Sequence, residues 1–210
     1  MKNLFLSFII FVLPSISFGQ TILSDTIGLN NGDKLSYIFK EFPSGKSTEI
    51  TYVIDEINDT TVIGRFYKGD LTLAFKSPAV GTIGDEVCYG IFEKCSFNPP
   101  MKLYDKSIKL GDEWRQNMKV VGETFTSDLA QEIKVIKQEK IRIQIGDFDT
   151  FKVVAKGKFR GTNTKGEKFS GTETLELWVG SIGNKLVVLK TNFSNSFYDR
   201  WSTELIRGPQ

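Results

Sequence analysis

Residues 147–189 constrain the fold most, because their apolar side chains recur at every second position over two strand lengths. Phe151, Val153 and Ala155 alternate with Lys152, Val154 and Lys156, and Leu175, Leu177 and Val179 alternate with Thr174, Glu176 and Trp178. A polar, glycine-containing connection at 161–171 joins the two runs, and a tighter turn at 180–184 leads into the apolar run 186–189. This pattern predicts three consecutive antiparallel strands.

The same alternation recurs elsewhere, with turn residues between the runs. It predicts strands at 35–40, 50–55, 62–67, 71–75, 133–136, 141–145 and 200–205. A helix competes only at 126–133, where Asp128 and Gln131 form a weak capping pair, and the strand that follows at Ile133 favours strand or loop. We therefore expect a mainly β protein, a curved antiparallel sheet or half-open β-barrel with little helix.

Two Gly-Asp turns each open a strand, and a second strand follows each about twenty residues later. The turns are Asn31-Gly32-Asp33 and Leu110-Gly111-Asp112. The similarity fits either an internal repeat or two unrelated hairpins that use common turn residues.

Residues 77–104 interrupt the strand pattern with Pro78, Gly81, Gly84 and Pro99-Pro100. They predict a long irregular excursion, with a short helical turn near 85–89. Cys88 and Cys95 are the two cysteines of the chain, and in an oxidising compartment they predict a local disulfide. A redox dithiol is disfavoured, because the spacing is not Cys-x-x-Cys.

The first nineteen residues have the pattern of a secretory signal peptide. Lys2 precedes an apolar core at 4–13, and small residues Ser17 and Gly19 stand before the expected cleavage site. The alternative, a membrane-anchoring helix, needs about 20 apolar residues. No cysteine stands near the cleavage site to carry a lipid, so we expect a cleaved signal peptide at 1–19 and one domain at 20–210, periplasmic or secreted and without a transmembrane segment.

The charges and the lack of histidine exclude several function classes. Lys and Arg number 27 against 25 Asp and Glu, so the net charge of +2 indicates neither nucleic acid nor an anionic membrane as a partner. Because the chain contains no histidine, imidazole metal sites and histidine-dependent catalysis are excluded. No phosphate-binding or calcium loop is present, so no metal site and no cofactor is predicted.

Acidic pairs are the remaining candidates for catalysis. They are Asp85-Glu86, Asp112-Glu113 and Asp147 with Asp149, all at predicted turns. A hydrolase would need two carboxyl groups within roughly 5–9 Å, one of them in an apolar pocket. Because turn carboxylates are ordinarily solvated, we expect no catalytic residues and no enzyme activity.

Aromatic residues support two interpretations. The 17 phenylalanines, with Trp114, Trp178 and Trp201, either fill the core of a curved sheet or line a cavity for an apolar ligand. Trp178 falls on the face opposite Leu177, which suggests packing on both sides of its strand.

The order of these elements resembles a known family. The relevant segments are Asn31-Gly-Asp-Lys-Leu-Ser-Tyr37, Leu110-Gly-Asp-Glu-Trp114, Ile145-Gly-Asp-Phe-Asp-Thr-Phe-Lys-Val153, Leu177-Trp178-Val179, Ile182-Gly183 and Glu204-Leu205-Ile206. Together they resemble the TapB-like envelope proteins of the Bacteroidota, which are similar to the half-open β-barrels of the LolA and LolB lipoprotein carriers. The Gly180-Ser-Ile-Gly-Asn-Lys185 turn and the Cys88–Cys95 segment depart from that family's pattern. Lipoprotein carrying is not implied, because function does not follow from fold.

The expected function is therefore that of an exported, non-catalytic protein that binds an apolar ligand or an envelope partner. The alternatives are an envelope interaction module without a small-molecule ligand and, least favoured, a carboxylate-based hydrolase. The pattern identifies no binding residues and predicts no oligomeric state.

Overall fold

The computed structural model describes residues 29–58, 61–78, 82–88, 93–105, 107–197 and 199–209, so the predicted signal peptide lies outside the described residues. These residues form twelve strands and no helix. The strands are β1 (Lys34–Phe42), β2 (Ser47–Asn58), β3 (Thr61–Lys68), β4 (Leu71–Ser77), β5 (Thr82–Cys88), β6 (Glu93–Lys102), β7 (Glu113–Val121), β8 (Phe125–Ile143), β9 (Gly146–Asn163), β10 (Lys168–Ile182), β11 (Lys185–Asn195) and β12 (Arg200–Arg207).

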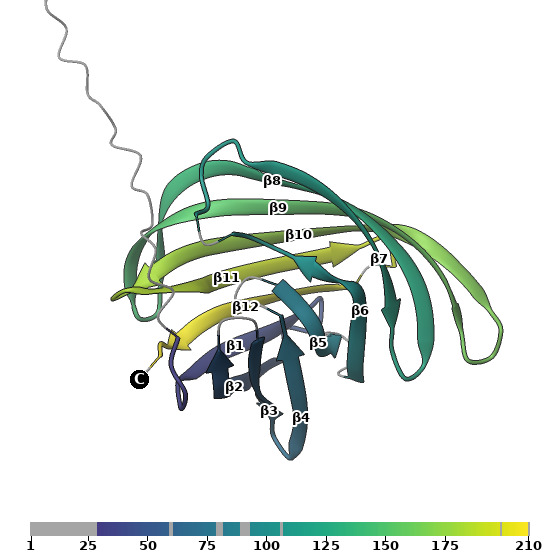
Figure 1. Ribbon diagram of the computed structural model, residues 1–210, viewed down its shortest axis with the longest axis horizontal. Coiled ribbons are helices and arrows are strands. Elements are labelled where there is room, and N and C mark those ends of the chain that lie inside the picture. Colours follow the sequence, from purple (N-terminus) through teal and green to yellow (C-terminus); the bar gives the residue numbers. More distant parts are fainter. Residues whose placement is uncertain are drawn as a thin grey trace, which may run out of the picture.

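Each strand pairs antiparallel with the next, and β12 pairs with β1, so the sheet closes into a barrel. The long strands β8, β9 and β10 arch over β2 to β5, which are shorter and lie on the other side of the barrel (Figure 1). The predicted curved antiparallel sheet is confirmed, including the three strands in 147–189. Residues 126–133, for which the sequence favours strand or loop over helix, belong to strand β8. The closure is weakest between β4 and β5, where Lys76 and Asp85 form the one residue pair within the described ranges.

The predicted irregular excursion at 77–104 is wrong, because β5 and β6 occupy most of it. The predicted helical turn near 85–89 is also wrong over 85–88, which belong to β5, and Tyr89 lies outside the described residues. The prolines of β6 explain why this segment was predicted to be irregular. The pairing of β6 with β7 stops at Asn98, directly before Pro99 and Pro100, which have no N–H to donate. The pairing of β6 with β5 on the other side also skips this segment, from Ser96 to Met101, and then continues to Lys102.

The predicted disulfide joins Cys88 of β5 to Cys95 of β6, with 5.7 Å between the two Cα atoms. Cys95 is buried in the core. Because the closed loop is short, the bond removes little chain entropy and contributes about 2 kcal/mol.

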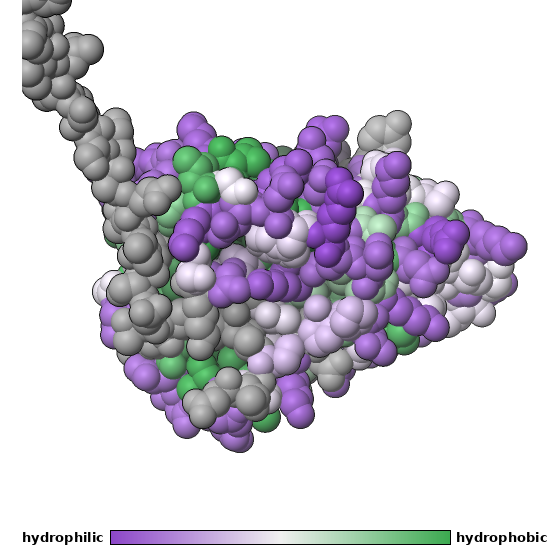
Figure 2. Space-filling model, turned by 45° about the horizontal axis from the view of Figure 1, so that its top comes forward, coloured by the Kyte–Doolittle hydropathy of each residue, from purple (hydrophilic) through white to green (hydrophobic). Residues whose placement is uncertain are grey.

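Side chains alternate between the barrel interior and the solvent. In β8, Leu129, Ile133 and Val135 are buried, and the residues beside them are mostly exposed. The interior holds two apolar clusters, one centred on Ile133, Val153 and Leu177 and the other on Phe39, Phe66 and Leu205. Hydrophilic residues cover most of the coloured surface in Figure 2, as this alternation requires.

The two Gly-Asp turns have the same structure. Gly32 and Gly111 both have a φ of +89°, which favours glycine. The Gly32 N–H donates to the Ile54 carbonyl, and the Ile54 N–H donates to the Asp33 carbonyl. Gly111, Val135 and Asp112 repeat both hydrogen bonds. A register shift follows Ile54 in β2 and Val135 in β8, so the similarity extends beyond the turns and supports an internal repeat.

The two turns differ in the surroundings of their aspartates. Asp33 is 1% exposed and forms an ion pair with Lys185, whose Nζ lies 2.6 Å from Oδ1 and 2.8 Å from Oδ2. Its Oδ2 also accepts from the Asn30 N–H. Asp112 is half-buried and accepts from the Lys109 N–H. The Asp33–Lys185 pair therefore ties the start of β1 to the β10–β11 turn.

Trp178 lies on the outer face of the barrel yet is only 7% exposed. Its indole N–H donates to Glu139, 2.9 Å away, and the Nζ atoms of Lys152 and Lys190 lie 4.6 and 5.5 Å from its ring centroid. The packing expected on both sides of β10 is thus present, and on the outside charged side chains provide it.

Candidate functional site

The interior of the barrel contains a cavity of about 700 Å³. Its volume falls within the roughly 300–1,000 Å³ typical of small-molecule sites. Members of both apolar clusters line it, including Leu35, Tyr37, Ile54, Phe75, Leu129, Leu177, Leu186 and Val187. The core is therefore hollow, and the lining is largely apolar.

Four phenylalanines form a group at one end of this cavity. They are Phe125, Phe159, Phe169 and Phe197, and the centroids of neighbouring rings lie 5.5–6.5 Å apart. Phe197 is 50% exposed, and the exposed residues Thr124 and Asp199 also line this end. The cavity therefore reaches solvent here, between the β7–β8 and β11–β12 turns.

A row of hydrogen-bonded side chains crosses the wall near this mouth. Gln116 of β7 donates through Nε2 to Oε1 of Gln131 in β8, at 2.9 Å. Gln131 donates through its own Nε2 to Oε1 of Glu173 in β10, at 2.8 Å. Gln131 is buried, and both Gln131 and Glu173 line the cavity. We call Gln116, Gln131 and Glu173 the glutamine row.

Strand register builds this row. Gln116 pairs across the sheet with Gln131, Gln131 with Gly157, and Gly157 with Glu173. Gly157 of β9 therefore lies between the two side chains that bond. A Cβ atom there would stand 2.8 Å from Cγ of Glu173 and 2.9 Å from Cδ1 of Leu129. Because glycine leaves this space free, Gln131 reaches Glu173 across an intervening strand.

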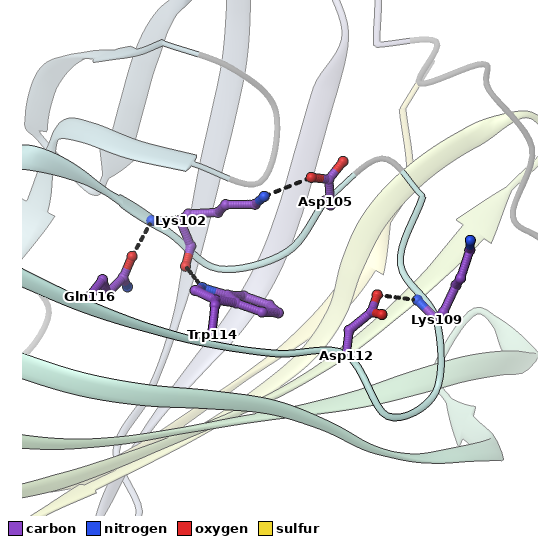
Figure 3. A network of polar contacts seen from close by, with 6 residues as sticks. All are labelled: Lys102, Asp105, Lys109, Asp112, Trp114 and Gln116. Atoms are coloured by element: carbon purple, nitrogen blue, oxygen red, sulfur yellow. Dashed lines mark hydrogen bonds and ion pairs between the residues drawn. The ribbon is translucent and has the colours of Figure 1, made fainter.

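The backbone of β6 sets the direction of the row, as Figure 3 shows at its Gln116 end. The Lys102 N–H donates to Oε1 of Gln116 at 3.0 Å, and the Trp114 indole N–H donates to the Lys102 carbonyl at 3.2 Å. Because an N–H can only donate, Oε1 of Gln116 is the acceptor and its Nε2 is directed to Gln131. Gln131 in turn presents Nε2, so Oε1 of Glu173 accepts.

Glu173 is the carboxyl group of the glutamine row and faces an apolar cavity. Burial raises its pKa above the ordinary value of 4.5, and the hydrogen bond from Gln131 opposes this shift in part. No Lys or Arg is among the residues that line the cavity in the described part of the chain. No ion pair to Glu173 is found there either. The carboxylate form therefore has no counter-charge from the described residues.

This raised pKa predicts the pH dependence of stability. Between 4.5 and its raised pKa, Glu173 binds more protons in the folded than in the unfolded chain. The free energy of unfolding therefore falls as the pH rises through that interval. The stability that protonation of Glu173 contributes is fully present only below pH 4.5. Glu173→Gln keeps an acceptor for Gln131 and removes the titration. Denaturant unfolding across a pH series should show wild type losing stability relative to Glu173→Gln as the pH rises, and parallel profiles would contradict this.

The other acidic candidates stand apart from the cavity. Glu113 pairs with Lys134 and Asp147 with Arg142, both at the surface, and Asp149 is exposed. The Asp112 carboxylate accepts a hydrogen bond from the Lys109 N–H within its own turn. The side chains of Asp85 and Glu86 lie outside the described part of the structure. Among the described residues, no three Cys, Asp or Glu side chains group as metal ligands, and no helix could cross a membrane.

One of the three tryptophans lines the cavity. Trp201 stacks on Phe193 with centroids 5.0 Å apart, and both face the interior space. Trp114 packs against the core, and Trp178 lies outside. The aromatic residues therefore fill the core and also line a cavity, since Phe39 and Phe66 are buried in the core while Phe169 and Phe193 line the cavity.

Sequence reasoning missed Gln131 and Glu173. The signal was present, because each stands two residues before an inward apolar residue, Ile133 and Leu175 respectively. A polar side chain at an inward position of a strand is unusual and calls for a hydrogen-bond partner. The sequence could not show that Gln131 and Glu173 are partners, because they meet only through the register of β9, which pairs with both of their strands.

Three solved structures are similar to this chain. A candidate lipoprotein from Parabacteroides distasonis is 16% identical, with a TM-score of 0.53 over 86% of this chain and 96% of the other. A candidate exported protein with YmcC-like fold from Bacteroides fragilis is 11% identical, with a TM-score of 0.43 over 86% and 96%. The hypothetical lipoprotein YmcC from Escherichia coli is 12% identical, with a TM-score of 0.46 over 90% of each chain.

The first of these similarities shows that the fold is shared, and at this identity it shows nothing about the ligand. No protein-family model matches the chain, and no curated protein is significantly similar to it in sequence. The cavity must therefore be interpreted from its own residues.

Proposed function

We propose that this chain is an exported, non-catalytic protein that binds an apolar ligand inside its barrel. The cavity of about 700 Å³ carries the proposal, because a closed sheet of this size would otherwise fill its interior with side chains. Its largely apolar lining, its aromatic mouth and the glutamine row fit an elongated molecule with one polar end.

Two further observations support the rest of the proposal. The signal-peptide pattern at 1–19 supports export to the periplasm or beyond. The acidic pairs Asp112-Glu113 and Asp147 with Asp149 lie outside the cavity lining, which counts against these residues as a catalytic pair in the cavity. A relationship to the TapB-like proteins and to the LolA and LolB barrels is part of this proposal, and it rests on the resemblance of their segments.

Filling the cavity tests the proposal. Leu175 lines the cavity beside Glu173, so Leu175→Trp should lower the affinity for an apolar dye, N-phenyl-1-naphthylamine, at least about 10-fold by occupying its volume. Thr174→Trp on the outward side of the same strand is the matched control and should bind as wild type does. Fluorescence titration measures both. Failure of wild type to bind the dye, or equal affinity in all three proteins, contradicts the proposal.

A second function, interaction with an envelope protein, has one observation in its favour. Leu110 and Ile136 are 51% and 52% exposed, and they adjoin the hydrogen-bonded pair Gly111 and Val135, so they lie near each other on the surface. This is a small apolar area, and native monomers commonly expose single residues of this kind. Ligand binding therefore remains the better-supported function.

A further inference from the structure

The glutamine row marks where the polar end of a ligand would lie. Along β10 the inward residues run from Phe169 at the mouth, through Glu173, to Leu175 and Leu177. Residues two apart on a strand are separated by about 7 Å. Glu173 therefore lies two such steps from Phe169 at the mouth, and the apolar part of the cavity continues beyond it.

Glu173 has one carboxyl oxygen in use. Oε1 accepts from Gln131, whose orientation follows from the Lys102 backbone N–H through Gln116. Among the described residues, no group donates a hydrogen bond to Oε2 or forms an ion pair with it. A carboxylate oxygen in an apolar cavity is unfavourable until a donor reaches it, and a charged donor compensates best.

We propose that the cavity selects a single-chain amphiphile whose head group is a hydrogen-bond donor, with a protonated amine preferred, and that Glu173 is the group that binds this head. This inference rests on the proposed function and adds the chemical class of the ligand. An amine placed at Oε2 supplies the counter-charge that the lining lacks. An anionic head would meet the carboxylate and be disfavoured.

Three probes with the same ten-carbon chain test the selectivity. Decylamine, decanol and decanoate carry a cationic, a neutral and an anionic head, and each competes with N-phenyl-1-naphthylamine for the protein at pH 7.5. For wild type we expect decylamine to bind about 10- to 100-fold more tightly than decanol, because a buried charge-assisted hydrogen bond discriminates by that order. Decanoate should bind most weakly.

Variants of β10 assign this selectivity to Glu173. Glu173→Gln should weaken decylamine about 10- to 100-fold while decanol changes less than about 3-fold. Glu176→Gln is the matched control, because Glu176 lies on the outer face of the same strand, paired with Lys152 at 2.8 Å, and should change neither affinity. Far-UV circular dichroism of each variant establishes that the barrel is folded.

The outcomes separate the two proposals. Equal binding of all three probes, or tightest binding of decanoate, overturns the head-group assignment and leaves apolar binding in place. If Glu173→Gln binds decylamine as tightly as wild type does, the head-group assignment is likewise overturned and apolar binding stays in place. If neither dye nor any decyl probe binds wild type, both the proposed function and this inference fail.

Discussion

Replacing Lys185 with methionine is expected to lower the free energy of unfolding by about 3–5 kcal/mol. Methionine keeps most of the apolar stem but removes the ammonium group that faces Asp33. Asp33 is 1% exposed, so its carboxylate would remain buried with the Asn30 N–H as the other contact to its side chain. An uncompensated buried charge is far more costly than the loss of a surface pair.

Two further variants test whether the unpaired Asp33 carboxylate causes the loss of stability in Lys185→Met. Asp33→Asn combined with Lys185→Met removes both charges, and it should recover much of the stability that Lys185→Met loses. Arg142→Met breaks the exposed pair with Asp147 and should cost less than about 1 kcal/mol. Urea unfolding with the slope compared between proteins measures all three. If Lys185→Met is as mild as Arg142→Met, the Asp33–Lys185 pair does not stabilise the barrel as proposed.

Phe66→Ala and Phe169→Ala should differ strongly although the substitution is the same. Phe66 is fully buried, with its ring centroid 5.3 Å from that of Tyr52, and its truncation should cost about 3–5 kcal/mol. Phe169 is half-buried and already borders the open space, so its truncation should cost about 1–2 kcal/mol. The difference reports whether the barrel is packed around Phe66 and hollow near Phe169.

The same denaturant experiment measures both variants, and dye binding separates their roles further. Phe169→Ala should weaken N-phenyl-1-naphthylamine binding, because the ring belongs to the cavity mouth. Similar losses of stability for the two variants would indicate an evenly packed interior, and the cavity would then have no support.

Strand positions were predictable because their signal is local. The alternation of Phe151, Val153 and Ala155 assigns their strand and its buried face from neighbouring residues alone. The error at 77–104 was local as well. Pro99 and Pro100 indicate a loop, but here they lie in a short part of β6 that has no pairing partner on either side.

The candidate site was predictable only as an aromatic-rich interior. Glu173 belongs to no sequence motif, and the other members of the glutamine row, Gln131 and Gln116, are 42 and 57 residues away from it in sequence. The Asp33–Lys185 pair spans 152 residues. Such contacts depend on which strands become neighbours and in what register.

By itself the sequence determined that this chain forms strands, which side of each strand is apolar, and that histidine chemistry is absent. Only the tertiary structure decided that the sheet closes around a cavity and that Gln131 meets Glu173 across Gly157. The physical reason is that alternation depends on adjacent residues, whereas closure and register are set by contacts between residues distant in the chain.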